Sequence, residues 1–403
     1  NKYIKDKPCL VTSFVPKGQV DQAVTGSEKA AVKEESIADA TQVEIKDDGA
    51  EAIAKTPTKT DRTVMPADGP DPQAVVPKVW TGKLKNGLRV FGVEDRELPL
   101  VQFSIELKGG HYLDPLDKPG VANLVCELMM EGTRNKTPLE LEEEIDRLGA
   151  SIYLTAGNNS ITLTANTLSR NYQQVLDLVR EILLEPRWDA DEFEMVKTRV
   201  LNQVRRQKAN PGILARNAFN TLLYGREHIL AYDRMGTEES LSAITRDDLV
   251  AFYKMAFIPS AASFQLAGSI TGEEVLASLR DIEYNWPAGE LAMPSYPPAA
   301  KVEKSRVYLV DVPGAKQSVI SIGCPGPVRT DPDYFPAVVM NYKLGGSFNG
   351  NVNLVLREEK GYTYGARTGF NGGLFAGNFN AGASVRSSAT AESVTIFRDL
   401  MEK

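Results

Sequence analysis

The chain has 403 residues, of which 42% are hydrophobic and 25% are charged, and its formal net charge is -7. This length and apolar content suffice for the cores of two ordinary domains, and no run of about twenty apolar residues encodes a membrane span. The negative charge excludes the basic excess that nucleic-acid binding requires. The three cysteines, Cys9, Cys126 and Cys324, are odd in number and far apart, so we expect neither a disulfide framework nor a cysteine zinc site.

The first 77 residues predict two different stretches. Residues 1–17 contain a helix end and a β-strand pattern, which we interpret as the tail of a preceding repeat. Residues 18–77 have few large apolar residues and predict an interdomain linker, with a short helix at 28–39. Because the chain begins with Asn1 and shows no signal-like region, we expect that a leader has been removed or that the sequence is a piece of a longer product.

Residues 78–302 predict a first α+β domain, in which helices pack on a largely antiparallel sheet. Period-two alternation, helical periodicity and turn dipeptides such as Asn86-Gly87 locate its elements. The strands are expected as a hairpin at 80–93 and at 101–107, 151–156, 160–168 and 261–268. The helices are expected after Pro119, from a capping box at Thr137 to Gly149, and at 170–184, 189–208, 211–223 and 245–256.

Residues 303–403 predict a second domain with the same order of elements, offset by about 215 residues, which indicates domain duplication. Its strands are expected at 307–312, 318–323, 362–368 and 377–385, and its helices at 334–344, 351–360 and 389–401. The second repeat stops where the first still continues. We therefore expect a chain that begins late in one repeat and ends midway through another, as a fragment does.

The helix after Pro119 organises the first repeat. Its apolar residues, at positions 121, 124, 125, 128 and 129, form the stripe of a core-facing helix. The opposite face carries Asn123 and Glu127, one turn apart, with Cys126 beside them. Two ligands at this spacing with an acid nearby hold zinc in inverted zincins, but the ligand residue types are missing here.

This helix resembles the zinc-site helix of the pitrilysin/insulinase family of metallopeptidases, whose pattern is Gly-x-x-His-x-x-Glu-His followed by Gly-Thr. By this resemblance Asn123 takes the place of the first histidine, Cys126 that of the general-base glutamate and Glu127 that of the second histidine. Asn202 and Gln203 lie about where the third ligand, a glutamate, would fall. The resemblance implies a non-catalytic copy that binds no metal, in a fold of homologous domains that enclose a chamber.

The second repeat contains a further motif of this resemblance. Arg357, at a helix end, and Tyr364, seven residues on, are similar to the Arg/Tyr pair found in the half of the family's active unit that lacks zinc. The resemblance implies that both side chains contact the substrate and its reacting carbonyl. A guanidinium and a phenol are suitable donors for that purpose. The alternative is a packed strand tyrosine and a solvated helix arginine.

A glycine-rich run of four residues, Gly345, Gly346, Ser347 and Phe348, precedes that motif. It lacks the Gly-Lys-Ser/Thr ending of a phosphate loop. A helix–helix turn is the simplest interpretation. In processing-peptidase relatives a glycine-rich loop in this region contacts the substrate, so the resemblance also makes these four residues candidates for substrate binding.

The only two histidines, His111 and His228, exclude a two-histidine helix site. We expect His111 in a turn or at the surface and His228 in a loop. Cys126 and Glu127 are about 100° apart on a helix, which argues against a metal site made of these two and His111.

Residues 140–146 predict a solvated acidic helix face, or less readily part of an acidic chamber wall. For Glu127 we expect a hydrogen-bonded residue in a vestige of the old site.

Taken together, the resemblance implies the non-zinc-binding half of a pitrilysin-like zinc endopeptidase. This half would form the substrate chamber for peptides and supply Arg357 and Tyr364. The chain would hold no cofactor and would be inactive alone, with zinc in a partner half of the same longer chain or in a separate subunit. A periplasmic or envelope location is expected if the protein is bacterial. The alternatives are an inert scaffold protein of the same fold and a stand-alone peptide-binding protein.

Overall fold

The computed structural model describes residues 75–299, 303–373 and 377–402, together with positions 15, 21, 23–28, 61, 64–65, 67, 69–70 and 73. The chain divides into two compact units, Asn1–Gln73 and Ala74–Lys403, and both repeats lie in the second unit. The strand expected within 1–17 and nearly all of the helix expected at 28–39 lie outside the described residues. Among the described helices, none has the length and apolar character needed to cross a membrane.

The first repeat contains a six-stranded mixed sheet in the order β1-β2-β6-β3-β5-β4. Only the β2–β6 pair is parallel, which confirms the largely antiparallel sheet predicted from the sequence. The strands are β1 (Val79–Lys83), β2 (Arg89–Glu94), β3 (Leu100–Lys108), β4 (Ser151–Ala156), β5 (Ser160–Leu168) and β6 (Ala262–Gly268). Buried and partly exposed positions alternate along β5, so helices cover one face of the sheet.

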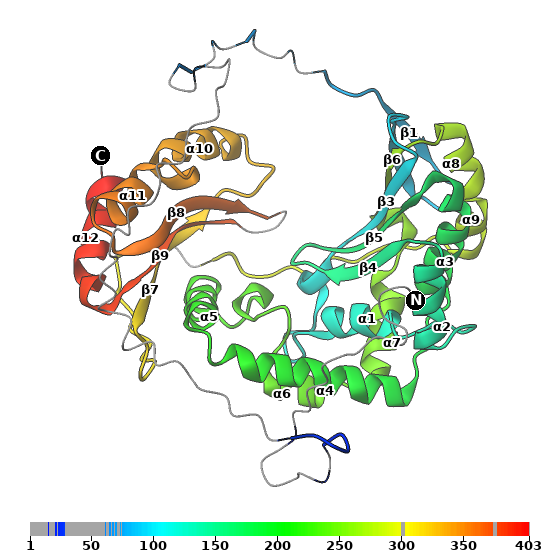
Figure 1. Ribbon diagram of the computed structural model, residues 1–403, viewed down its shortest axis with the longest axis horizontal. Coiled ribbons are helices and arrows are strands. Elements are labelled where there is room, and N and C mark those ends of the chain that lie inside the picture. Colours follow the sequence, from blue (N-terminus) through cyan, green and yellow to red (C-terminus); the bar gives the residue numbers. More distant parts are fainter. Residues whose placement is uncertain are drawn as a thin grey trace. The chain divides into compact units, whose positions relative to one another are not determined.

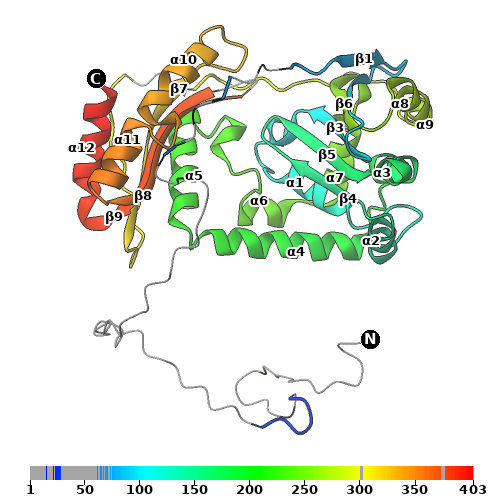
Figure 2. The same cartoon turned by 45° about the horizontal axis from the view of Figure 1, so that its top comes forward.

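Helices cover that buried face in the first repeat, and α3, α8 and α9 lie on the same side of the sheet (Figure 1). The helices of this repeat are α1 (Val121–Met129), α2 (Pro138–Arg147), α3 (Tyr172–Leu184), α4 (Ala190–Gln207), α5 (Pro211–Tyr224), α6 (Glu238–Ala243), α7 (Arg246–Ala256), α8 (Gly272–Ser278) and α9 (Arg280–Asn285), and α5 packs against β7 (Gln317–Gly326) and not on this sheet. The capping box expected at Thr137 is present, with Glu140 as its partner. The long helix α4 lies against α6 (Figure 2).

Short 3-10 turns connect these elements. They are η3 (Gly110–Leu113), η4 (Ser169–Asn171), η5 (Ile229–Ala231) and η6 (Pro259–Ala261). One apolar core joins the sheet to α1, α3, α4 and α7. Helix α1 contributes its whole predicted stripe to this core, so the helix is fixed against the sheet and its polar face is turned away from the core.

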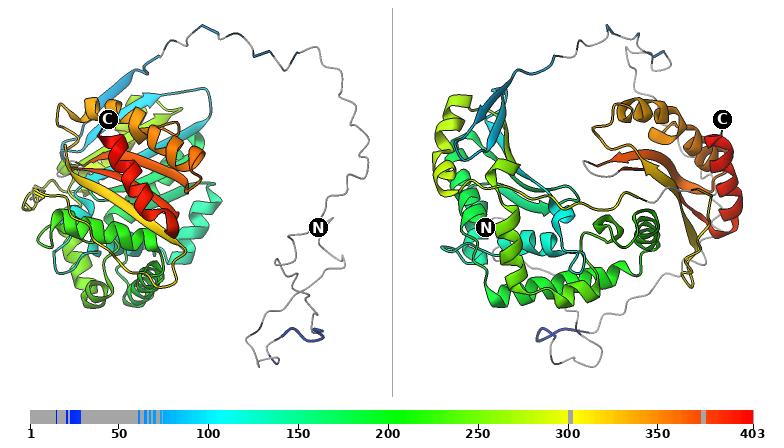
Figure 3. Two further views of the ribbon diagram at one scale, coloured as in Figure 1. Left: turned by 90° about the vertical axis from the view of Figure 1, so that its left-hand side faces the viewer. Right: turned by 180° about the vertical axis from the view of Figure 1, so that it is seen from behind.

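The second repeat contains a three-stranded antiparallel sheet in the order β7-β9-β8. This order reproduces that of β3, β5 and β4, as a duplicated fold requires. The elements are β7 (Gln317–Gly326), α10 (Tyr334–Asn341), η7 (Tyr342–Gly346), α11 (Asn351–Asn353), η8 (Leu354–Glu359), β8 (Thr363–Gly372), β9 (Gly377–Arg386), η9 (Ser387–Ala389) and α12 (Thr390–Met401). Helix α12, in red, lies across β7 and β9 (Figure 3, left).

The strand expected at residues 307–312 is wrong. These residues have no regular structure, and the side chains of Val307 and Leu309 are 96% and 93% exposed. Their counterpart in the first repeat, β2, is held between β1 and β6. Among the described residues of the second repeat no strand lies beside 307–312, and an apolar pattern without partner strands cannot form a sheet.

The helices expected at 334–344 and 351–360 are present but change type. Both pass into π-helical turns, η7 and η8, after eight and three α-helical residues. Such turns are rare and occur most often at functional sites. Here they include Gly345, Gly346 and Arg357, three of the residues that the sequence marks as candidates.

Candidate functional site

Asp114 fixes the start of α1. The helix begins after Gly120, a glycine with φ 106° that has no side chain for capping. The carboxylate of Asp114 takes over that role, because Oδ2 accepts a hydrogen bond from the Gly120 N–H (2.8 Å) and Oδ1 one from the Ala122 N–H (2.7 Å). A carboxylate at a helix N-terminus also interacts favourably with the helix dipole.

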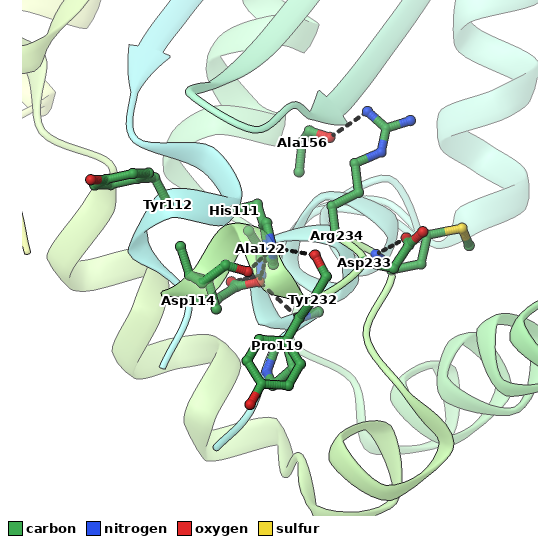
Figure 4. A network of polar contacts seen from close by, with 12 residues as sticks. His111, Tyr112, Asp114, Pro119, Ala122, Ala156, Tyr232, Asp233 and Arg234 are labelled. Carbon is green, nitrogen blue, oxygen red and sulfur yellow. Dashed lines mark hydrogen bonds and ion pairs between the residues drawn. The ribbon is translucent and has the colours of Figure 1, made fainter. Parts of the chain in front are cut away.

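His111 extends this contact to a distant segment (Figure 4). Its Nδ1 lies 2.8 Å from Asp114 Oδ2, and its Nε2 lies 3.1 Å from the carbonyl oxygen of Ile229 and 3.2 Å from that of Tyr232. Carboxylate and carbonyl oxygens only accept, so each of these contacts needs a proton on the ring nitrogen that makes it. The buried His111–Asp114 contact ties η3, α1 and η5 together.

The turn expected at His111 is confirmed and the surface location is wrong, because the side chain is 1% exposed. Gly109 and Gly110, with φ of 119° and 55°, turn the chain so that the ring points inward. His228 lies in the loop expected for it, but its ring is buried as well. Its Nδ1 accepts a hydrogen bond from the Leu230 N–H (3.0 Å), which caps η5.

His228 should make the first repeat lose stability as the pH decreases below neutrality, and this contribution is the difference between the wild-type chain and a His228 variant. Burial, and then the charge of His111, hold the pKa of His228 below its ordinary value. Below the ordinary histidine pKa of about 6.5 the unfolded chain therefore binds a proton that the native ring does not, and stability is lost until the native pKa is passed. Urea unfolding at several pH values measures this slope. His228→Asn keeps an acceptor for Leu230 and should flatten the slope, whereas an unchanged slope would contradict the assignment.

An ion pair occupies the polar face of α1. Arg199 of α4 reaches Glu127 Oε2 of α1 at 2.9 Å and Glu131 Oε1, just after the end of α1, at 2.8 Å. Partial burial acts to lower the pKa of Arg199, but the hydrogen bonds and charges of Glu131 and Glu127 outweigh it and raise the pKa. Glu127 is thus hydrogen-bonded, as expected. The residue of α4 that contacts it is Arg199, whereas Asn202 and Gln203 are exposed.

These residues do not fit a zinc ion. The guanidinium of Arg199 places a positive charge between the carboxylates of Glu127 and Glu131. Asn123 Nδ2 is buried and has no hydrogen-bond partner within the described ranges, and an amide nitrogen is a donor and not a metal ligand. Within the same ranges no three His, Cys, Asp or Glu side chains are placed to hold a metal ion.

Cys126 cannot replace the general base of such a site. Burial, followed by the charges of Glu127 and Asp114, raises the pKa of its thiol. A thiol of this kind stays protonated and packs as a small apolar side chain. Cys126 contributes to the core of the first repeat together with the apolar residues of α1.

Thiol labelling should separate the two described cysteines. In the native chain Cys324 is exposed and Cys126 is buried, so iodoacetamide should modify Cys324 and leave Cys126 unmodified. Peptide mapping by mass spectrometry locates the label. In urea both sites should react. Rapid native labelling of Cys126 would contradict the burial of α1.

The structure brings two of the predicted site segments of the second repeat together. The guanidinium carbon of Arg357 lies 4.6 Å from the ring centroid of Phe348, within cation–π range. Arg357 Nε also lies 3.2 Å from Glu358 Oε1, and its side chain is 35% exposed. Ser347 Oγ donates to the carbonyl of Tyr342 at 3.2 Å. Arg357 is therefore held against the glycine-rich run with part of its guanidinium accessible.

Tyr364 is the second residue of β8. Its side chain is 91% exposed, and the pairing of β8 with β9 shifts register between Thr363 and Ala366. The helix before it ends at Gly361, with φ 61°, as the sequence predicts. An exposed tyrosine at a strand irregularity presents its hydroxyl to whatever approaches this edge.

Gly345 and Gly346 have a packing role. A Cβ on Gly345 would lie 2.6 Å from Thr368 Oγ1 and 2.7 Å from a methyl of Val352, and one on Gly346 would lie 3.0 Å from Asn341 Nδ2. Glycine therefore allows η7 to approach β8 closely, in agreement with a helix–helix turn. Phe348, by contrast, is exposed and free to contact a ligand as well as Arg357.

Comparison with known families gives two matches that together cover most of the chain. Residues 90–230 match the family model described as "Insulinase (Peptidase family M16)", and residues 243–403 match the one described as "Peptidase M16 inactive domain". An uncharacterized zinc protease of Streptomyces coelicolor is 23% identical over 70% of this chain and 62% of its own length. A non-peptidase homolog of Helicobacter pylori is 22% identical over 67% of this chain and 62% of its own length. This chain thus spans about three fifths of these relatives.

Solved structures show the same fold. A peptidase M16 inactive domain from Pseudomonas fluorescens superposes with a TM-score of 0.76 at 26% identity, over 81% of this chain and 78% of that chain. A protease from Helicobacter pylori superposes with a TM-score of 0.73 at 19% identity, over 80% and 79%. The periplasmic protease PqqL from Escherichia coli superposes with a TM-score of 0.64 at 18% sequence identity. The match covers 78% of this chain but only 36% of that longer chain.

Proposed function

Because the chain belongs to peptidase family M16, we propose that it is the half of a zinc endopeptidase that does not bind zinc. In this role it forms part of the wall around a peptide substrate and supplies Arg357 and Tyr364 to a reaction whose metal is held by another half or subunit. The observation that carries the proposal is the contrast between the two repeats. In the first repeat, Arg199 pairs with Glu127 on α1, the helix that resembles the family's zinc-site helix, and with Glu131. In the second repeat, both residues of the Arg/Tyr motif are accessible.

The chemistry of the second repeat suits this role. The guanidinium of Arg357 offers fixed donors to a peptide carbonyl or carboxylate. The phenol of Tyr364 can donate to the oxygen that becomes negatively charged as an amide is attacked. Phe348 lies under Arg357 and adds an apolar surface for a substrate side chain. All of these groups bind or orient a peptide, and the reacting water and its activation belong to the partner half.

The test is reconstitution with an M16 chain that carries His-x-x-Glu-His. Cleavage of a set of internally quenched peptides is measured for each chain alone and for the mixture. We expect no cleavage by this chain alone and a gain in the mixture. The gain should vanish when the glutamate of the partner's motif is replaced by glutamine. Cleavage by this chain alone, or no gain on mixing, overturns the proposal.

An inert scaffold is the second candidate. The Helicobacter pylori relative is described as a non-peptidase homolog, which favours this candidate. A scaffold would still bind the partner half, but turnover would not depend on Arg357 or Tyr364. The two functions therefore differ in the effect of those substitutions, and not in whether a complex forms.

A further inference from the structure

Asn353 lies where three segments of the second repeat meet. Its side chain is 3% exposed, and it stands at the end of α11, directly before η8. We propose that Asn353 is a positioning residue that holds the glycine-rich run, the Arg357 turn and the Tyr364 strand edge in one arrangement. This inference rests on the proposed function for its purpose, although the contacts themselves do not.

The amide of Asn353 makes two backbone hydrogen bonds of opposite sense. Nδ2 donates to the carbonyl of Phe348 at 2.7 Å, and Oδ1 accepts from the N–H of Ala366 at 3.0 Å. A carbonyl can only accept and a backbone N–H can only donate, so the orientation of the amide is fixed. Aspartate could satisfy Ala366 but would set an oxygen against the Phe348 carbonyl. Alanine would satisfy neither group.

The bond to Ala366 stabilises a β-bulge. Thr363 is paired with Val385 and Ala366 with Ala383, so Tyr364 and Gly365 together face one residue of β9. Thr363 Oγ1 closes the bulge, because it accepts from the Gly365 N–H (3.1 Å) and donates to the Gly365 carbonyl (2.9 Å). The bulge is what turns the Tyr364 side chain outward.

The bond to Phe348 acts on the other half of the site. It holds the backbone of the residue whose ring lies under Arg357. One buried amide therefore fixes both the support of Arg357 and the bulge of Tyr364. If the amide is lost, the Phe348 backbone that supports Arg357 and the bulge that carries Tyr364 should move independently of each other.

Hydrogen exchange of the full chain tests the coupling directly. In Asn353→Ala we expect the Ala366 amide and the amides of residues 348–350 to exchange about tenfold faster or more, from the loss of both hydrogen bonds. Asn353→Asp keeps the acceptor for Ala366, so it should accelerate exchange at residues 348–350 alone. The amides of β7 and β9 should keep their rates. Phe397→Leu is the matched control, because Phe397 is buried in the same core and touches neither bond. It should accelerate exchange throughout the second repeat.

Two further measurements test the proposal, and the first uses only the wild-type chain, so it holds even if an Asn353 variant fails to fold. In the wild-type chain at low urea, the amides of Ala366 and Gly350 should open in one event, with a common dependence on urea, before those of β9. Fluorotyrosine at position 364 should give one narrow ¹⁹F resonance, which broadens or splits in Asn353→Ala and not in Phe397→Leu. Unlinked opening, or an unchanged resonance in a folded Asn353→Ala variant, overturns the inference. A failed reconstitution would remove the proposed function and leave these results to decide the role of Asn353.

Discussion

Replacing Asp114 with asparagine should destabilise the first repeat by about 3–5 kcal/mol, because the buried carboxylate is the shared partner of His111 and of two N–H groups at the start of α1. The asparagine amide would still accept from one of the two N–H groups at the start of α1. Its NH₂ group would face the remaining donors, which are either the Ala122 N–H or both the Gly120 N–H and His111 Nδ1. The substitution thus removes a carboxylate charge, weakens the cap of α1 and disturbs the contact with His111 at once.

Tryptophan fluorescence during urea unfolding measures this effect selectively. All three tryptophans, Trp80, Trp188 and Trp286, lie in the first repeat, so the signal reports on that repeat. Asp146→Asn is the control, because this carboxylate lies on the exposed face of α2 and should change the free energy of unfolding by less than about 0.5 kcal/mol. A loss below about 1 kcal/mol for Asp114→Asn would contradict the role of this carboxylate in fixing His111 and the start of α1.

Local signals in the sequence were sufficient for much of the fold. The capping box at Thr137, the strand pair at 151–168 and the apolar stripe of α1 depend on neighbours within a few residues, and all are confirmed. The repeated order of elements likewise predicts the duplicated α+β fold. Short helices such as α6 and α8 were missed because their apolar periods are too brief to recognise.

Long-range contacts explain what the sequence could not predict. The ring of His111 is buried by carbonyls of Ile229 and Tyr232, more than a hundred residues away in the chain. Arg199 meets Glu127 because of the register of α4 against α1, and the family pattern directs attention to Asn202 and Gln203 instead. The candidate roles of Arg357 and Tyr364 stay predictions, since geometry alone does not establish that they act on a substrate.

The largest effect on activity should come from substitutions of Arg357 and Tyr364. In the reconstituted enzyme, Tyr364→Phe should lower the turnover number by about 10²–10³, the usual cost of removing one donor from a developing oxyanion. The ring remains, and an exposed hydroxyl contributes little to folding, so the free energy of unfolding should not change. Tyr284→Phe, at another exposed tyrosine, is the control and should have no effect on turnover.

Arg357→Ala separates the two ways in which a donor can act. If the guanidinium only holds the substrate, KM rises and kcat is kept, whereas a contact made in the transition state lowers kcat and kcat/KM together. We expect a fall in kcat/KM of about 10²–10³ in which both constants change, because the guanidinium can donate to a carbonyl before and during the reaction. Arg398→Ala controls for loss of an exposed arginine in the same repeat. If the enzymes reconstituted with Arg357→Ala and with Tyr364→Phe both turn over at the wild-type rate, neither side chain takes part in catalysis. The chain is then a scaffold for its partner half.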